Sequence, residues 1–184
     1  MTNYLSITEK AKIVRKSLKE IGITSKQVSV KSSYCGYSDK LSINIKDLSI
    51  SKQTIEGIAK KFEEYERDER SGEILEGGNT YVFIDFDYQT LRSAAEEMMP
   101  KAKEIFETRK QLEQNECEAI KLNDDMVITY APCANSIRLT KYNKVTDPNG
   151  SYINPETLSN HAAWNEHDIA AALGFWKHQY KLNI

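Results

Sequence analysis

The chain contains 184 residues, of which 40% are apolar and 28% are charged, and its formal net charge is −2. That length fits one domain, or one domain with an extension. Four Pro and eight Gly exclude a collagen-like or low-complexity chain. No apolar run approaches the ~20 residues of a membrane span, and residues 1–10 lack the apolar segment of a secretory signal. We therefore expect a soluble, globular protein of the cytoplasm, with no membrane partner.

The small net charge conceals an uneven distribution along the chain. Residues 1–53 carry a net charge of +6, residues 54–128 carry −9, and residues 129–184 carry +1. Such a chain can present a basic face to phosphates and an acidic face elsewhere. The alternative is that the helices simply carry solvated charge and the fold mixes the signs in space.

The first elements are predicted from periodicity and capping. Ser6 and Glu9 have the spacing of a capping box, and apolar residues at helical spacing then predict a helix over residues 8–20. Two runs of alternating apolar and polar residues, 27–31 and 41–46, flank a Gly/Ser/Asp segment. That pattern predicts a β-hairpin with one apolar and one polar face.

The middle of the chain is predicted to be helix, strand and helix. The first of these helices begins after Ser51 and ends near Arg70. A turn at residues 77–79 precedes a strand over Thr80–Ile84. A long helix is then expected from Tyr88 to Cys117, which Pro100 should kink or split.

The last third is predicted to be rich in strands and to end in a helix. Strands are expected over residues 118–122, 126–130 and 136–142, followed by a polar loop over residues 143–154. The final helix begins at Pro155 or at Asn165 and ends at Gln179.

These elements define an α+β class. Residues 8–86 form an N-terminal α-β-β-α-β unit with an antiparallel sheet. Residues 87–184 supply the long helix and then a β-rich and helical C-terminal extension. We expect this extension to pack on the first unit as one globular body.

Signals for catalysis are weak. The sequence contains no phosphate-binding loop, dinucleotide fingerprint, nucleophile elbow or zinc-protease motif. The three cysteines are widely spaced, which argues against a disulfide framework and a structural zinc site. A thiol enzyme would need Cys133 together with one of the late histidines, His161, His167 or His178. We expect no catalytic residue, no metal and no cofactor.

Binding is better supported, because the hairpin gathers basic, aromatic and hydroxyl side chains. Lys31, Tyr34, Tyr37 and Lys40 lie close together among Ser and Asn residues, and such groups can stack bases and hold phosphates. The alternative is an ordinary solvated sheet face. The basic side of the first helix would add to this group if it packs beside the sheet edge. Its candidate residues are Arg15 and Lys19.

Two further groups of residues are candidates for partner contact. A second basic and aromatic group lies in the last third and consists of Arg138, Lys141 and Tyr142, with Tyr130 and Lys144 nearby. Large aromatic residues near the C-terminus are typical of protein interfaces, although they can equally be buried against the sheet. These are Trp164, Phe175, Trp176 and Tyr180.

The hairpin segment also resembles a known family. Residues 29–45 are similar to the Ser/Tyr/Gly-rich hairpin of a large polyvalent-protein-associated domain, and residues 77–82 resemble the Gly-Gly-Asn-x-Tyr-Val strand of that family. The likeness extends over residues 8–86. Ile45 departs from the family pattern, which often has Trp there. Residues 87–184 resemble no family.

This resemblance implies a setting in bacteriophages and conjugative elements, and it implies no catalytic residues. We therefore expect a non-catalytic binding protein that inhibits a host defence system. Its partner would be a host defence protein or ribonucleoprotein, for example an RNA-guided CRISPR effector or its guide RNA. Alternatives are a nucleic-acid-binding accessory factor in element transfer or replication, and a small enzyme of unknown reaction. A variant of the first hypothesis has the acidic residues Glu63, Glu64, Asp68 and Glu69 mimic nucleic acid.

Overall fold

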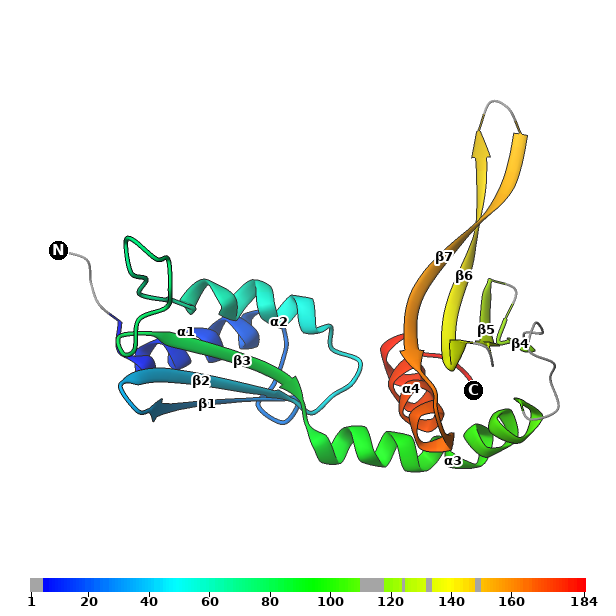
Figure 1. Ribbon diagram of the computed structural model, residues 1–184, viewed down its shortest axis with the longest axis horizontal. Helices are drawn as coiled ribbons and strands as arrows, with labels where there is room; N and C mark the ends of the chain where they lie inside the picture. The colour runs from blue at the N-terminus through cyan, green and yellow to red at the C-terminus, as the bar shows by residue number, and fades with distance from the viewer. Residues whose placement is uncertain (1–4, 110–117, 124, 132–133, 148–149) are drawn as a thin grey trace. The chain divides into compact units, whose positions relative to one another are not determined.

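The computed structural model describes residues 5–109, 118–123, 125–131, 134–147 and 150–184. The chain forms an α+β fold with two compact units, Met1–Thr90 and Leu91–Ile184. Figure 1 labels their helices and strands.

The N-terminal unit begins with the predicted helix and hairpin. Helix α1 spans Ile7–Glu20, and Ser6 caps it in a full capping box with Glu9. Strands β1 (Val28–Cys35) and β2 (Ser38–Ile45) pair antiparallel. The capping spacing and the change of period therefore located these elements correctly.

The three-stranded sheet of this unit is mixed, not antiparallel as expected. Strand β3 (Thr80–Phe86) pairs parallel with β2, in the order β1-β2-β3. The chain leaves the end of β2, passes through helix α2 (Lys52–Ala59), and returns to the start of β3. A long crossover of this kind permits parallel pairing, whereas a tight turn permits only antiparallel pairing.

The second helix is shorter than predicted, because the chain after Phe62 is extended and bridges the start of β3 at Glu64. Helix α2 continues only as a single 3₁₀ turn, η1 (Lys60–Phe62), and does not reach Arg70. Glu64 exchanges two backbone hydrogen bonds with Thr80, of 2.9 and 3.1 Å. This tertiary pairing at the edge of β3 outweighs the helix propensity of the run.

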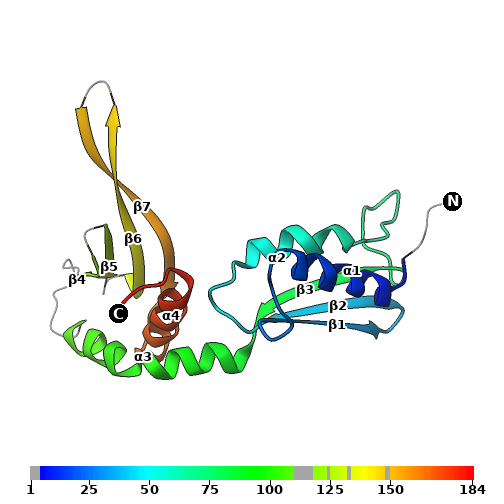
Figure 2. The same cartoon turned by 180° about the vertical axis from the view of Figure 1, so that it is seen from behind.

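One face of the sheet is buried and the other is open. Figures 1 and 2 show α1 and α2 on the same side of the three strands. The core between these layers is apolar. Its largest fully buried members are Ile7, Leu41, Ile43, Ile45 and Ile55.

The C-terminal unit contains a four-stranded antiparallel sheet, in the order β4-β5-β6-β7. The strands are β4 (Glu118–Lys121), β5 (Met126–Ala131), β6 (Ser136–Asp147) and β7 (Gly150–Ala162). The predicted loop over residues 143–154 is wrong for residues 143–147 and 150–154, which belong to β6 and β7 and pair with each other; residues 148–149 lie outside the described residues. Pro155 is tolerated within β7 because β7 is an edge strand, where a missing N–H need not break the ladder.

Two helices complete this unit. Helix α3 spans Tyr88–Arg109, belongs to this unit from Leu91 onward, and is not split at Pro100; its predicted end at Cys117 lies outside the described residues. Helix α4 spans Glu166–Gln179, and the Asn165 side chain accepts hydrogen bonds from the N–H groups of His167 and Asp168. The helix start at Asn165 is therefore confirmed and the start at Pro155 is wrong.

Helix α4 packs on α3 so closely that only glycine fits at one position. A Cβ on Gly174 would collide with the carbonyl group of Ala94. Gly57, in α2, has no such neighbour within 4 Å.

We predict opposite effects for the same substitution at these two glycines. Gly174→Ala should lower the free energy of unfolding by about 2 kcal/mol through overpacking. Gly57→Ala should raise it by about 0.5–1 kcal/mol, because alanine loses less backbone entropy in a helix. Both tryptophans lie in the C-terminal unit, so denaturant titration followed by tryptophan fluorescence reports the first change and far-UV circular dichroism the second. Equal effects at the two sites would contradict this account of the α3–α4 contact.

Candidate nucleic-acid interface

The open face of the N-terminal sheet gathers the polar and aromatic residues of all three strands. The alternation that buries Val30, Ile43 and Ile84 directs the intervening side chains to the other face. Strand register arranges nine of these in three rows that run from β1 across β2 to β3. The rows are Ser33, Lys40 and Tyr81; Lys31, Ser42 and Phe83; and Ser29, Asn44 and Asp85.

Aromatic rings form the β3 side of this face. The centroids of Tyr81 and Phe83 lie 6.3 Å apart with a tilt of 32°, and Tyr65 packs edge-on against Tyr81 at 5.5 Å. Phe83 is 48% exposed although it is one of the most apolar side chains of the chain. An exposed ring beside a second ring is a surface on which planar groups can stack.

A lysine lies over this aromatic group. Lys40 Nζ is 4.9 Å from the centroid of the Phe83 ring, a cation–π distance. Lys40, Tyr37, Tyr81 and Phe83 help to line a shallow pocket of about 380 Å³. Cationic and stacking groups therefore meet at the hairpin end of the open face.

A glycine turn holds Tyr37 at this pocket. The Gly78 N–H donates to the Tyr37 carbonyl at 3.0 Å, and a Cβ on Gly77 would lie 3.3 Å from the Tyr37 Cβ. Both glycines have positive φ, 96° and 69°, which other residues adopt only at a cost. The turn predicted at residues 77–79 is confirmed, and it places the β1–β2 turn beside the start of β3.

Buried Asn79 fixes the other side of the same turn. Its side-chain oxygen accepts from the Glu66 N–H at 2.8 Å, and its amide nitrogen donates to the Leu75 carbonyl at 2.7 Å. These bonds satisfy a polar side chain that is 1% exposed. The segment between α2 and β3 is therefore tied to the edge of the open face.

The structure brings together only some of the predicted hairpin residues. Lys31, Tyr37 and Lys40 belong to the open face or its pocket. Tyr34 is 76% exposed, but along β1 it shares a face with Val28 and Val30, opposite the open face. It lies apart from the other three.

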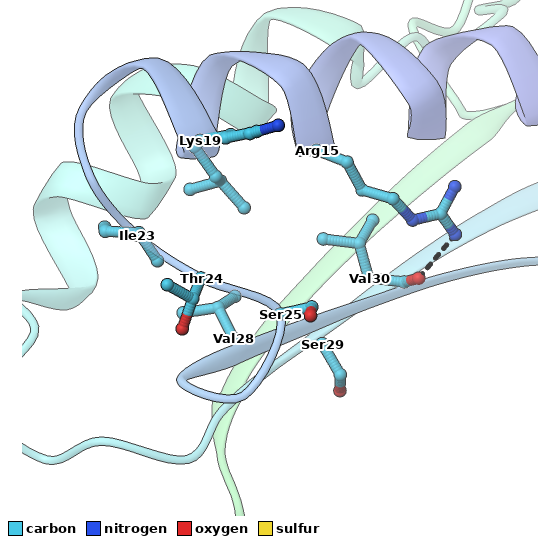
Figure 3. A pocket seen from close by; sticks show the side chains of 9 residues that line it. Arg15, Lys19, Ile23, Thr24, Ser25, Val28, Ser29 and Val30 are labelled. Carbon is cyan, nitrogen blue, oxygen red and sulfur yellow. Dashed lines mark hydrogen bonds between the residues drawn. The ribbon is translucent and has the colours of Figure 1, made fainter.

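Arg15 and Lys19 do not contribute to the open face, because α1 covers the opposite side of the sheet. They line a separate pocket of about 530 Å³ between α1 and β1, shown in Figure 3. Arg15 Nη2 donates to the Val30 carbonyl at 2.6 Å. The first helix therefore packs beside the edge of β1, but its basic residues form a second location.

The basic and aromatic group in the C-terminal unit is divided between two faces. Arg138 and Tyr142 occupy alternate positions of β6 and share one face. Lys141 lies on the opposite face, and its register partner on β7 is Glu156. Tyr130 is fully buried, and its hydroxyl donates to the Ala163 carbonyl at 3.3 Å. This group does not form one surface.

Most of the late aromatic residues are structural. Trp176 is fully buried and Phe175 and Tyr180 are half-buried, as the burial alternative predicts, while Trp164 is 67% exposed. The His161 ring packs 5.6 Å from Trp176, and burial lowers the pKa of His161. Cys133 lies outside the described residues, so its distance to the histidines is not defined.

Several of the acidic residues considered for nucleic-acid mimicry have roles in the fold. Glu64 accepts from buried Lys10 at 2.8 Å. Asp68 accepts from two backbone N–H groups, of Arg70 and Ser71, which lower its pKa. Glu63 accepts from Lys60 at 2.8 Å. These carboxylates stabilise the segment that leads into β3.

Two residues of this interface, Tyr81 and Phe83, were not predicted from the sequence. The sequence identifies both residues only as strand formers. The sequence pattern that could identify them is their alternation with Val82 and Ile84, which places both rings on the face opposite the core. Recognising them also requires the parallel pairing that sets β3 beside Lys40.

Comparisons with protein-family models, curated proteins and solved structures find no match. Within the described ranges, no helix is long and apolar enough to cross a membrane. The described residues also contain no cluster of three or more His, Cys, Asp or Glu that could hold a metal ion.

We predict that the contact between Gly77 and Tyr37 is specific to this site. Gly77→Ala and Gly72→Ala both force alanine into a positive φ, but only Gly77 faces a neighbour within 4 Å. Each should cost about 1–2 kcal/mol of backbone strain. In ¹⁵N–¹H spectra, Gly77→Ala should shift the amides of Tyr37 and Lys40, and Gly72→Ala should leave them unchanged. Equal shifts in both variants would contradict the packing described here.

Proposed function

We propose that this protein is a non-catalytic binding protein that holds single-stranded nucleic acid, and RNA in particular, on the open face of its N-terminal sheet. The observation that carries this proposal is the placement of Tyr81 and Phe83 side by side on β3, in the same rows as Lys40 and Lys31.

The chemistry of the face fits an unpaired strand better than a duplex. Unpaired bases can stack on aromatic rings, and each such contact is worth about 1–3 kcal/mol. Lys31 and Lys40 can then neutralise phosphates, and Ser42 and Asn44 offer hydrogen bonds to sugar or base edges. A duplex hides its base faces and would leave the exposed Phe83 ring without a partner.

The sequence resemblance supplies the proposed setting. In a phage or conjugative element, the bound strand would be RNA of a host defence ribonucleoprotein, such as the guide RNA of a CRISPR effector, and binding would inhibit that machine. The second candidate, an accessory factor in element transfer or replication, would use the same face on free nucleic acid. Binding to free RNA compared with binding to the assembled ribonucleoprotein distinguishes the two.

Removing one ring tests the stacking surface. We predict that Phe83→Ala weakens binding of a fluorescein-labelled ten-nucleotide poly(U) RNA about tenfold, because one base loses its stacking partner. Tyr88→Ala is the matched control, since Tyr88 is also an exposed ring of this unit but lies outside the face. Fluorescence anisotropy measures both affinities. Wild-type affinity in a folded Phe83→Ala variant would overturn the proposal.

Salt dependence tests the lysines. Each phosphate contact on a single strand contributes about 0.7 to the slope of log K against log salt concentration. Lys40→Gln and Lys31→Gln should each reduce the slope by about that amount. Lys12→Gln, an exposed lysine on α1, should not. An equal reduction in all three variants would indicate diffuse attraction and contradict a defined path for the strand.

A further inference from the structure

We infer that the free edge of β1, together with the pocket beneath α1, is a second binding surface that takes an extended acidic segment of a partner protein as an added strand. This surface is distinct from the open face, and the inference does not depend on RNA binding.

The backbone of β1 is available for strand addition along its outer edge. Lys46 N–H donates to the Gln27 carbonyl at 2.7 Å, which marks residues 27, 29, 31 and 33 as the positions bonded to β2. The intervening residues, Val28, Val30, Ser32 and Tyr34, direct their N–H and C=O groups away from β2. The Val28 N–H already donates to the Thr24 carbonyl at 3.0 Å, so the N–H groups that an added strand would meet begin at Val30. In the order β1-β2-β3, that side is the edge of the sheet, and such edges are templates for extended segments.

The pocket lies on the side to which these outward residues point their side chains. Its apolar lining comes from Leu18, Ile23, Val28 and Val30, and it encloses about 530 Å³. Figure 3 shows it open between α1 and β1. In an antiparallel added strand, the residues that bond β1 also face this side, so the same residues would fill the pocket.

The charge of the pocket selects an acidic occupant. Arg15 and Lys19 line it from α1, and its other polar lining residues are the neutral Thr24, Ser25 and Ser29. Arg15 already donates to the outward Val30 carbonyl, the acceptor that an added strand would use. A carboxylate on the added strand would draw the guanidinium away and release that carbonyl, and Arg–carboxylate pairs are among the stronger hydrogen-bonded contacts.

A designed peptide tests the geometry. The probe is a fluorescein-labelled decapeptide that alternates Val with Thr and has one central Glu in a Val position, so that Val and Glu share one side. N-methylation of the Val and Glu amides should abolish binding, because those N–H groups face β1. N-methylation of the Thr amides should preserve it. No binding of the parent peptide, or equal loss from both methylation patterns, would overturn the inference.

Variants of the full chain test the residues. Arg15→Glu should weaken peptide binding about tenfold through repulsion of the carboxylate, whereas Lys16→Glu, exposed on the same helix but outside the pocket, should leave it within about twofold. Ser32→Pro removes one outward N–H at a position where an edge strand tolerates proline, and it should also weaken binding. Unchanged affinity in a folded Arg15→Glu protein would overturn the inference.

A substitution and a competition experiment separate the two surfaces. Phe83→Ala should not alter peptide affinity, and poly(U) RNA should not displace the peptide. Displacement by RNA would assign the pocket to the nucleic-acid surface and overturn the inference of a protein partner.

Discussion

The candidate site depends on one constraint, the register between β2 and β3. Because the two strands run parallel with Lys40 opposite Tyr81 and Ser42 opposite Phe83, the lysine and the rings occupy neighbouring rows. A shift of one residue would turn Tyr81 and Phe83 into the core and expose Val82 and Ile84. The burial of Leu41, Ile43 and Ile45 therefore determines which side chains lie on the open face as well as which lie in the core.

The segment between α2 and β3 maintains that register at the start of β3. Lys10, 2% exposed on α1, donates to Glu64 at 2.8 Å and to Thr80 at 2.9 Å, which joins the helix layer to the start of β3. Buried charge is tolerated there because it is paired and hydrogen-bonded. Asn79 and the two glycines then connect this start to the β1–β2 turn. The acidic residues of the segment are best understood as part of this connection.

Local signals predicted most of the elements, while pairing between distant segments decided the rest. The Ser6 capping box, the alternation in β1 and β2 and the Asn165 cap are read from a few adjacent residues, and each is present. The charged run after Phe62 and the polar residues 143–154 look like helix and loop locally, but each finds a strand partner far along the chain or across a hairpin. For the same reason the sequence predicts the lysines of the candidate site but not its rings, because Lys40 and Phe83 are neighbours only through parallel pairing.

The basic residues of the first 53 positions do not form one patch, and this division bears on how the protein would act. Lys31 and Lys40 lie on the open face beside aromatic rings, whereas Arg15 and Lys19 line an apolar pocket at the β1 edge. Rings with cations favour nucleic acid, and an apolar pocket with cations beside a free backbone edge favours an acidic protein segment. Strand β1 belongs to both surfaces, since its odd residues face the sheet surface and its even residues face the pocket. Under the two proposals above, the N-terminal unit would hold RNA on one surface and an acidic protein segment on the other.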